Sequence, residues 1–127
     1  MKNRKQILVI EDHNGLRMME GMFLKNYYDV VTQKDGLDGI IWLSAGNFPD
    51  LIVLDLMMPR LNGVEFLINI KSSGIFRDIP VIIVSGDEDQ IIIDRCKKLG
   101  STDYMIKPFD PRQLYERIEK ILNAIPA

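Results

Sequence analysis

Five short apolar runs alternate with segments of helical periodicity, and this alternation constrains the fold more than any other feature of the sequence. Three of the runs consist almost wholly of Val, Ile and Leu, which is typical of parallel strands that are buried on both faces. We therefore predict five strands, which cover residues 7–10, 30–32, 51–54, 81–84 and 104–106.

Each predicted strand is followed by a segment with apolar residues at helical spacing, and we expect those residues to face the sheet. The predicted stripes are Leu16, Met19, Met22 and Phe23; Leu37, Ile40, Ile41 and Ala45; Val64, Leu67 and Ile68; Ile92, Cys96 and Leu99; and Leu114, Ile118, Ile121, Leu122 and Ile125. The residue types that cap helix N-termini precede or open each segment. The predicted N-caps are Asn14, Asp35, Asn62, Asp87 and Asp110.

Strand and helix thus alternate five times, which favours an α/β fold. Because crossovers between parallel strands are right-handed, the helices should cover both faces of one doubly wound, five-stranded parallel sheet. The chain of 127 residues has the usual size of one compact domain, and it contains no internal repeat or linker. We expect a single domain over residues 1–127.

The composition argues against several functional classes. The formal net charge is −2, which offers no electrostatic reason to expect nucleic acid or an anionic membrane as a partner. The apolar run after the basic residues 1–5 is too short for a signal peptide, and no stretch is long enough to span a bilayer. The one cysteine, Cys96, cannot form an internal disulfide and fits a reducing compartment, so we expect a cytoplasmic protein.

Polar residues stand at the ends of four of the five predicted strands. The first strand is followed by Glu11 and Asp12, the third by Asp55, the fourth by Ser85 and the fifth by Lys107. In an open parallel sheet, ligands bind at the carboxyl ends of the strands. We therefore expect these side chains to meet at one edge of the sheet.

Three carboxylates at one edge repel one another, because like charges about 4 Å apart cost roughly 4 kcal/mol per pair at an effective dielectric of 20. A divalent cation removes this conflict, and an all-oxygen ligand set suits Mg²⁺. A lysine that faces a carboxylate and a metal is suited to hold a phosphoryl group, and a carboxylate can be the nucleophile that forms an aspartyl phosphate. The residue pattern therefore points to phosphoryl chemistry.

In this order, the motifs resemble the signature of the response-regulator receiver family of two-component signalling, and of chemotaxis regulators within it. The resemblance rests on Glu11-Asp12, on the Leu-Asp-Leu-Met-Met-Pro sequence of 54–59 with Gly63, on Ser85-Gly86 and on Lys107-Pro108. It covers essentially the whole chain. It implies a flavodoxin-like sheet with strand order 2-1-3-4-5. It also implies a regulatory phosphoacceptor rather than an enzyme, one that takes part only in its own phosphorylation and dephosphorylation.

The same resemblance assigns the acidic residues. It implies that Asp55 is the phosphoacceptor, and that Asp12, Asp55 and the backbone carbonyl of Met57 bind Mg²⁺. Glu11 is expected to act on the metal through water. The side chain of Met57 and that of Asp87 occupy positions that tune the lifetime of the phosphate in this family. His13 adjoins the acidic pair and is given no role, since a lone histidine in a loop is usually solvated.

Three further residues are expected to detect the phosphate. By resemblance, Lys107 contacts the phosphate oxygens, Ser85 donates a hydrogen bond to one of them, and Tyr104 is the aromatic residue that moves inward in response. The Lys107–Pro108 bond is expected to be cis. A phosphoryl group adds about −1.5 to −2 of charge, and shifting an equilibrium from 1:99 to 99:1 takes about 5.5 kcal/mol. One hydrogen bond does not supply this, so Mg²⁺, Lys107 and Ser85 must act together.

The resemblance also implies the partners. The phosphoryl donor is a histidine kinase or a histidine phosphotransfer protein, and the signal passes to a downstream target protein or output domain. The face formed by the fourth helix, the fifth strand and the fifth helix is a candidate docking or homodimer surface. A helix cannot turn Ile91, Ile92 and Ile93 inward together, so Ile91 or Ile93 should be exposed there. We expect no direct contact with nucleic acid or a membrane.

Three alternative readings compete with this one. A haloacid-dehalogenase-like phosphatase requires a second aspartate at position 57, where this chain has Met57. A flavin module requires a Ser, Thr and Gly loop after the first strand, where this chain has acidic residues. The third is a receiver-like interaction scaffold that signals without phosphorylation. The presence of Asp12, Asp55 and Lys107 together argues against it.

Overall fold

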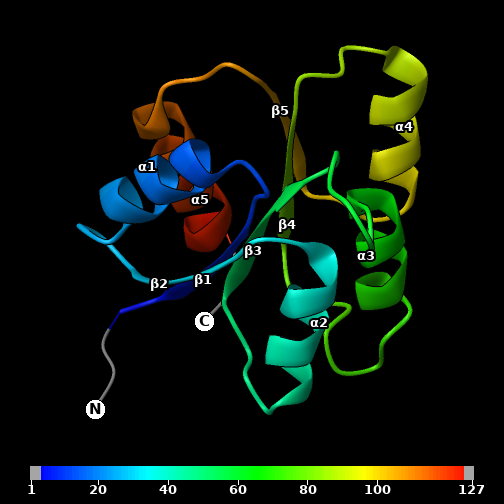
Figure 1. Ribbon diagram of the computed structural model, residues 1–127, viewed down its shortest axis with the longest axis horizontal. Coiled ribbons are helices and arrows are strands. Elements are labelled where there is room, and N and C mark those ends of the chain that lie inside the picture. The colour runs from blue at the N-terminus through cyan, green and yellow to red at the C-terminus, as the bar shows by residue number, and fades with distance from the viewer. Residues whose placement is uncertain (1–3, 125–127) are drawn as a thin grey trace.

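The structure is a computed structural model, and it describes residues 4–124. Strands and helices alternate along the described chain, as predicted (Figure 1). The strands are β1 (Gln6–Ile10), β2 (Asp29–Gln33), β3 (Leu51–Asp55), β4 (Val81–Ser85) and β5 (Asp103–Ile106). The helices are α1 (Asn14–Leu24), α2 (Gly36–Ser44), α3 (Gly63–Lys71), α4 (Gln90–Lys98) and α5 (Pro111–Ala124).

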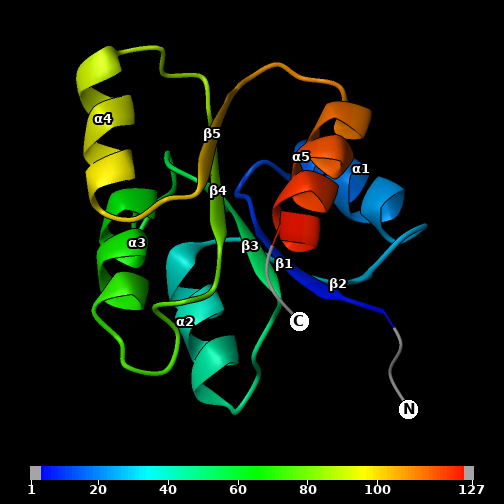
Figure 2. The ribbon, with the colours of Figure 1, turned by 180° about the vertical axis from the view of Figure 1, so that it is seen from behind.

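The strands form one parallel sheet in the order β2-β1-β3-β4-β5, so the predicted fold class and strand order are confirmed. Helices α1 and α5 cover one face of the sheet, and α2, α3 and α4 cover the other (Figures 1 and 2). The order reverses between β1 and β3, which lie side by side. The carboxyl ends of these two strands therefore flank the switch point, where open α/β sheets bind ligands.

Successive residues of each central strand enter opposite cores. In β1, Leu8 and Ile10 pack in the cluster beneath α2 and α3, whereas Ile7 and Val9 pack in the cluster beneath α1 and α5. Every residue of β3 and β4 is buried. This explains why their sequences are continuous in apolar residues rather than alternating. Within residues 4–124, no helix has the length and apolar character needed to cross a membrane.

The predicted inward-facing stripes of α1, α2 and α3 are wrong in part. Met19 is 44% exposed and Met22 is 66% exposed, while α1 buries Glu20, Gly21 and Leu24 instead. In the second stripe the exposed members are Leu37, Ile41 and Ala45. In the third, Ile68 is 39% exposed, while α3 buries Phe66 and Ile70 beside Leu67.

In α1 and α2 the reason is that the helix approaches the sheet through glycine. A Cβ atom at Gly39 would lie 2.6 Å from Cδ1 of Ile10, and one at Gly21 would lie 3.2 Å from Cγ2 of Thr32. A search for large apolar residues overlooks such contacts. Ile125, in the predicted stripe of α5, lies outside the described residues.

Three predicted N-caps are confirmed: the side chains of Asp35, Asn62 and Asp110 accept hydrogen bonds from the first turns of α2, α3 and α5. Helix α1 instead follows His13, whose Nδ1 accepts from the N–H of Leu16 at 3.1 Å. Helix α4 follows Asp89, which accepts from the N–H of Ile91. Asn14 and Asp87 are therefore wrong as N-caps, because each helix begins at a slightly different residue than the pattern suggests.

Candidate functional site

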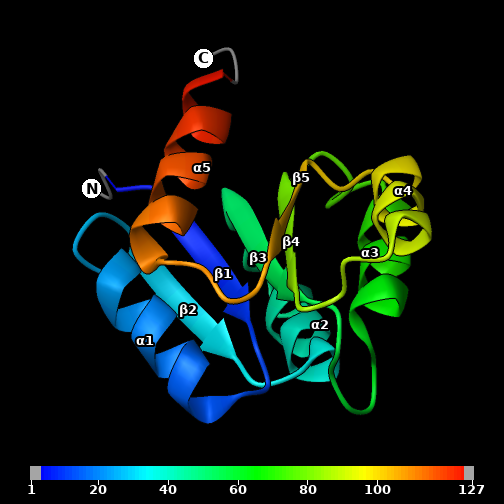
Figure 3. The same ribbon diagram turned by 90° about the horizontal axis from the view of Figure 1, so that it is seen from above.

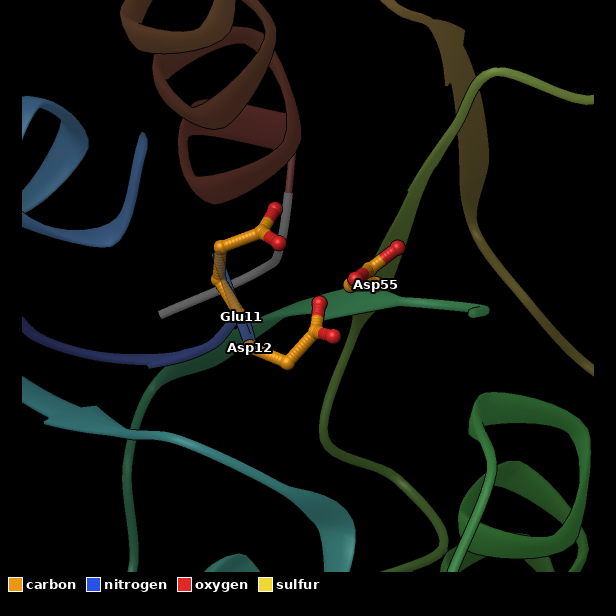
Figure 4. Close-up of side chains that lie close together, drawn as sticks. All are labelled: Glu11, Asp12 and Asp55. Atoms are coloured by element: carbon orange, nitrogen blue, oxygen red, sulfur yellow. The ribbon is translucent and has the colours of Figure 1, made fainter. Parts of the chain in front are cut away.

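The topology brings three acidic residues together at the carboxyl edge of the sheet. Strands β1 and β3 lie side by side in the sheet (Figure 3). Glu11 and Asp12 directly follow β1, and Asp55 is the last residue of β3. One carboxylate oxygen from each residue lies within 4.8 Å of the others. The carboxylate of Asp12 extends toward that of Asp55 (Figure 4). Glu11 and Asp55 are buried and Asp12 is exposed, so the cluster is open to solvent on one side.

Lys107 joins this cluster from the end of β5. Its Nζ lies 2.8 Å from Oε1 of Glu11 and 3.3 Å from Oδ1 of Asp55. The backbone N–H of Lys107 donates to the carbonyl oxygen of Ser85 at 2.8 Å, which connects this segment to β4. The Lys107–Pro108 peptide bond is cis, as predicted. Lys107 therefore lies beside the acidic residues, as expected from the sequence, and its contact with a phosphate remains a prediction.

The charges of this cluster perturb one another. Burial is the main cause that raises the pKa of Asp55 to about 8, and the neighbouring Asp12 and Glu11 raise it further, against the opposing charge of Lys107. Burial alone would lower the pKa of Lys107, but its bonds to Glu11 and Asp55 outweigh burial and raise the pKa. The ammonium group of Lys107 thus pairs with Glu11 and Asp55, and the exposed carboxylate of Asp12 completes the acidic cluster. This donor set, hard and rich in negative charge, fits a divalent cation such as Mg²⁺.

Met57 lies on the loop that follows β3, and its backbone folds back toward the acidic cluster. The N–H of Met57 donates to Oδ1 of Asp55 at 3.2 Å. The Met57 side chain is 72% exposed and points away from the core. The role of its carbonyl as a metal ligand remains a prediction, and so do the roles assigned to Asp12 and Glu11.

Ser85 and Tyr104 both hold the loop that follows β4. Ser85 is fully buried, and its Oγ accepts from the N–H of Asp87 at 3.0 Å. The hydroxyl of Tyr104 donates to the carbonyl oxygen of the same Asp87 at 2.8 Å. Burial raises the pKa of the Tyr104 phenol, so this group stays a hydrogen-bond donor. A change in the hydrogen bonding of Ser85 can therefore affect Tyr104 through Asp87. The switching role of the two residues remains a prediction.

The sequence analysis missed the contacts of Arg17. Its guanidinium donates to the carbonyl oxygen of Glu11 at 2.8 Å and to Oδ1 of Asn14 at 2.6 Å. Arg17 thus fixes the backbone of the loop that carries the acidic pair. Its place on the first turns of α1, close to that loop in sequence, was the signal that could have indicated this contact.

Glu20 was also missed, although it lies close enough to the site for the charges of Glu11 and Lys107 to affect it. Glu20 is fully buried in α1, and neither carboxylate oxygen has a hydrogen-bond partner among the described residues. Burial, followed by the charge of Glu11, raises its pKa to about 8. Glu20 was not predicted to face the sheet because glutamate is ordinarily exposed.

Comparison with known proteins identifies the class. The sequence model of the response regulator receiver domain matches residues 7–119. The chain therefore belongs to the response regulator receiver domain family of two-component signalling. The family is regulatory, its members act between histidine kinases and downstream effectors, and receiver domains in general bind Mg²⁺.

Individual relatives agree with this assignment. The chain is 36% identical over 122 residues to the response regulator ArlR of Staphylococcus aureus strain Mu50, and the match covers 95% of this chain and 54% of ArlR. The chain therefore spans about half the length of that relative.

Two solved structures are similar in fold. The chemotaxis protein CheY4 of Vibrio cholerae has a TM-score of 0.86 at 24% identity, covering 93% of this chain and 98% of that one. The phosphorylated cyanobacterial phytochrome response regulator RcpA has a TM-score of 0.81 at 29% identity, covering 93% of this chain and 91% of that one.

Proposed function

We propose that this protein takes a phosphoryl group onto Asp55 from the phosphohistidine of a histidine kinase or phosphotransfer protein, and that the modification switches partner binding. One observation carries the proposal. Asp55 is a buried strand-end carboxylate with the carboxylate oxygens of Asp12 and Glu11 within 4.8 Å and the ammonium group of Lys107 at 3.3 Å. A nucleophile, a cation site and a phosphate-binding lysine therefore meet at one edge of the sheet.

In the reaction, a carboxylate oxygen of Asp55 forms a bond to phosphorus while the bond from phosphorus to the imidazole nitrogen breaks, and the imidazole keeps that electron pair. The attacking oxygen must be ionised, and the raised pKa of Asp55 opposes this in the metal-free site. Mg²⁺, held by Asp12, Asp55 and the Met57 carbonyl, with Glu11 acting through water, would supply the positive charge that stabilises the ionised carboxylate and the phosphate oxygens.

Lys107 and Ser85 are the groups that would detect the phosphate. The Lys107 ammonium group is a compact charge on a flexible stem, so it can move from Asp55 to the phosphate oxygens as these form. The Ser85 hydroxyl can donate to a phosphate oxygen. Ser85 Oγ and the Tyr104 hydroxyl both contact Asp87. A new hydrogen bond from Ser85 to the phosphate would therefore change the conformation of the loop before α4.

The output of the switch would be a change in protein contacts. RcpA, a relative of similar fold, has been solved in a phosphorylated form, which supports phosphorylation as the input. The face formed by α4, β5 and α5 is the surface that we assign to a downstream partner or a second copy of the chain. Ile91 on α4 is 77% exposed, as the sequence predicted for one of Ile91 and Ile93. We place this activity in the cytoplasm, where the lone Cys96 stays reduced.

The test uses a small phosphodonor. The protein would be incubated with acetyl phosphate in the presence and absence of Mg²⁺, and the intact mass and the modified peptide would be measured. We expect one phosphate, on Asp55, that depends on Mg²⁺. If acetyl phosphate does not react, the same measurement is made with a histidine kinase as donor. A protein that neither binds Mg²⁺ nor accepts phosphate from either donor would contradict the proposal and favour a scaffold that acts by contact alone.

Lys107→Ala is expected to leave the protein folded. Asp55 should still accept phosphate, but more slowly, and the conformational switch should be abolished. The free energy of unfolding should fall by about 1–3 kcal/mol, because buried Glu11 loses its cation. Backbone amide NMR spectra of residues 85–89 and 104, recorded before and after phosphorylation, measure the switch. Lys98→Ala is the control, because Lys98 is an exposed residue of α4. Wild-type spectral changes in the Lys107 variant would refute this role.

A further inference from the structure

Arg60 lies on the loop formed by residues 56–62, which joins β3 to α3, and its side chain reaches across to the start of α2. Its Nε donates to Oδ2 of Asp35 at 3.0 Å, and its Nη2 donates to the same oxygen. Nη2 also contacts Oδ1 of Asp38 at 3.2 Å. These ion pairs connect the loop that carries Met57 to the start of α2, at residues 25 and 22 positions before Arg60.

Asp35 offers a rigid anchor for this contact. The residue is 3% exposed, and its Oδ1 accepts from the N–H of Asp38 at 2.8 Å as the N-cap of α2. Its second oxygen is the one that Arg60 contacts. Burial alone would raise the pKa of Asp35, but the hydrogen bonds from Asp38 and Arg60 outweigh burial and lower the pKa. The carboxylate is therefore ionised and fixed in orientation.

The backbone of Arg60 has a φ of +65°, in the left-handed region that residues with a bulky side chain adopt at an energetic cost. The ends of the loop are held without Arg60, since the N–H of Gly63 donates to the carbonyl oxygen of Leu56 at 3.0 Å. A Cβ atom at Gly63 would also lie only 2.5 Å from the carbonyl oxygen of Asp55. Arg60 acts at the middle of the loop, where an unfavourable backbone conformation needs a compensating contact.

We infer that Arg60 is a positioning residue for phosphoryl transfer: its ion pairs with Asp35 and Asp38 hold the 56–62 loop so that the Met57 backbone stays beside the Asp55 carboxylate. The inference rests on the proposed function, in which the Met57 carbonyl is a metal ligand. Loosening the loop should weaken the binding of Mg²⁺ and leave the chemistry of Asp55 intact. The defect should therefore disappear when Mg²⁺ is raised to saturation.

The experiment compares Arg60→Gly and Arg60→Ala with the wild-type protein. Glycine removes the side-chain contacts together with the backbone cost, whereas alanine removes the contacts and keeps that cost. The Mg²⁺ dissociation constant is measured by calorimetry, without any phosphodonor. We expect it to rise about fivefold to tenfold in both variants, with the larger change in Arg60→Ala. The rate of phosphorylation by acetyl phosphate should fall at low Mg²⁺ and return to the wild-type value at saturating Mg²⁺.

Three further variants separate positioning from general destabilisation. Asp35→Asn retains an N-cap side chain for α2 and removes the charge that faces Arg60, so it should weaken Mg²⁺ binding to a similar extent. The double variant Asp35→Asn with Arg60→Ala should be no worse than the single variants, since both remove the same contact. Lys34→Ala is the matched control. Lys34 lies 3.9 Å from Asp38 with a mostly exposed side chain, and among the described residues no hydrogen bond or ion pair joins it to the loop, so its loss should leave Mg²⁺ binding unchanged.

Amide hydrogen exchange of residues 56–62 gives a second readout that does not depend on activity. Exchange in this loop should become faster in Arg60→Gly, while exchange in the central strands stays slow. Mg²⁺ affinity and loop exchange within twofold of the wild-type values in both Arg60 variants would overturn this inference alone. A wild-type protein that binds no Mg²⁺ would overturn the proposed function and this inference with it.

Discussion

Replacement of Asp55 with asparagine is expected to abolish phosphorylation. Asparagine retains the shape of the side chain and an oxygen that can accept the 3.2 Å hydrogen bond from the N–H of Met57, but its amide is not a nucleophile that forms an acyl phosphate. The intact mass of Asp55→Asn should therefore stay unchanged after incubation with acetyl phosphate and Mg²⁺. We expect the rate to fall by at least about a thousandfold, to the limit of detection.

The same variant should be more stable than the wild-type protein in metal-free solution at pH 8. Since the pKa of Asp55 is raised to about 8 in the folded state, the folded protein binds more protons than the unfolded chain between about pH 4 and pH 8. The stability associated with protonated Asp55 is complete below about pH 4 and is lost as the pH rises through 8. Asparagine does not ionise, so Asp55→Asn keeps its stability as the pH rises. Its free energy of unfolding should exceed that of the wild type at pH 8 by about 1–3 kcal/mol.

Two variants serve as controls for Asp55→Asn. Asp94→Asn, on the exposed surface of α4, should leave both labelling and stability unchanged. Asp12→Asn keeps the phosphoacceptor and should slow labelling without moving the modified residue. Wild-type labelling of Asp55→Asn would show that the phosphate is carried elsewhere.

Replacement of Glu20 with leucine is expected to stabilise the protein strongly at alkaline pH. Glu20 is fully buried, and neither of its carboxylate oxygens has a hydrogen-bond partner among the described residues. Leucine has a similar volume and helix propensity and does not have to be desolvated as a polar group. We expect the free energy of unfolding at pH 8, measured with urea, to rise by about 3 kcal/mol.

The pH dependence identifies the origin of this effect. Because the pKa of Glu20 is raised from 4.5 to about 8 on folding, its stabilising protonation is complete below about pH 4.5 and is lost as the pH rises through 8. The advantage of Glu20→Leu should therefore be smallest near pH 5 and grow toward pH 8. Glu20→Gln, which cannot ionise, should also lose this pH dependence but gain less stability, since its amide is still buried without a partner.

Glu116→Gln is the control for the Glu20 variants, because Glu116 is an exposed carboxylate on α5. It should change neither the stability nor its dependence on pH. Equal stability of Glu20→Leu and the wild type from pH 5 to pH 8 would mean that Glu20 finds a favourable partner in solution, contrary to our expectation.

Much of the site could be predicted because it is attached to strand ends. The apolar run before Asp55 is short and continuous, which is typical of a strand buried on both faces, and the shorter run before Lys107 forms the edge strand β5. Because the strands are parallel, their carboxyl ends lie at one edge of the sheet, whatever the detailed packing of the helices. The presence of Glu11, Asp55 and Lys107 at one place follows from this topology alone.

The sequence by itself therefore predicted the alternation of strands and helices, the edge of the sheet that carries the chemistry and the residue types available there, while the strand order followed from the family resemblance. The tertiary structure decided which helix faces pack inward, because Gly21 and Gly39 allow a close approach that hydrophobic periodicity does not encode. It also decided how the loops around the site are held, since the contacts of Arg60 with Asp35 join segments whose separation in sequence carries no signal. A long side chain on a loop pairs with whichever group lies near it in space, and these neighbours are set only when the sheet and helices have packed.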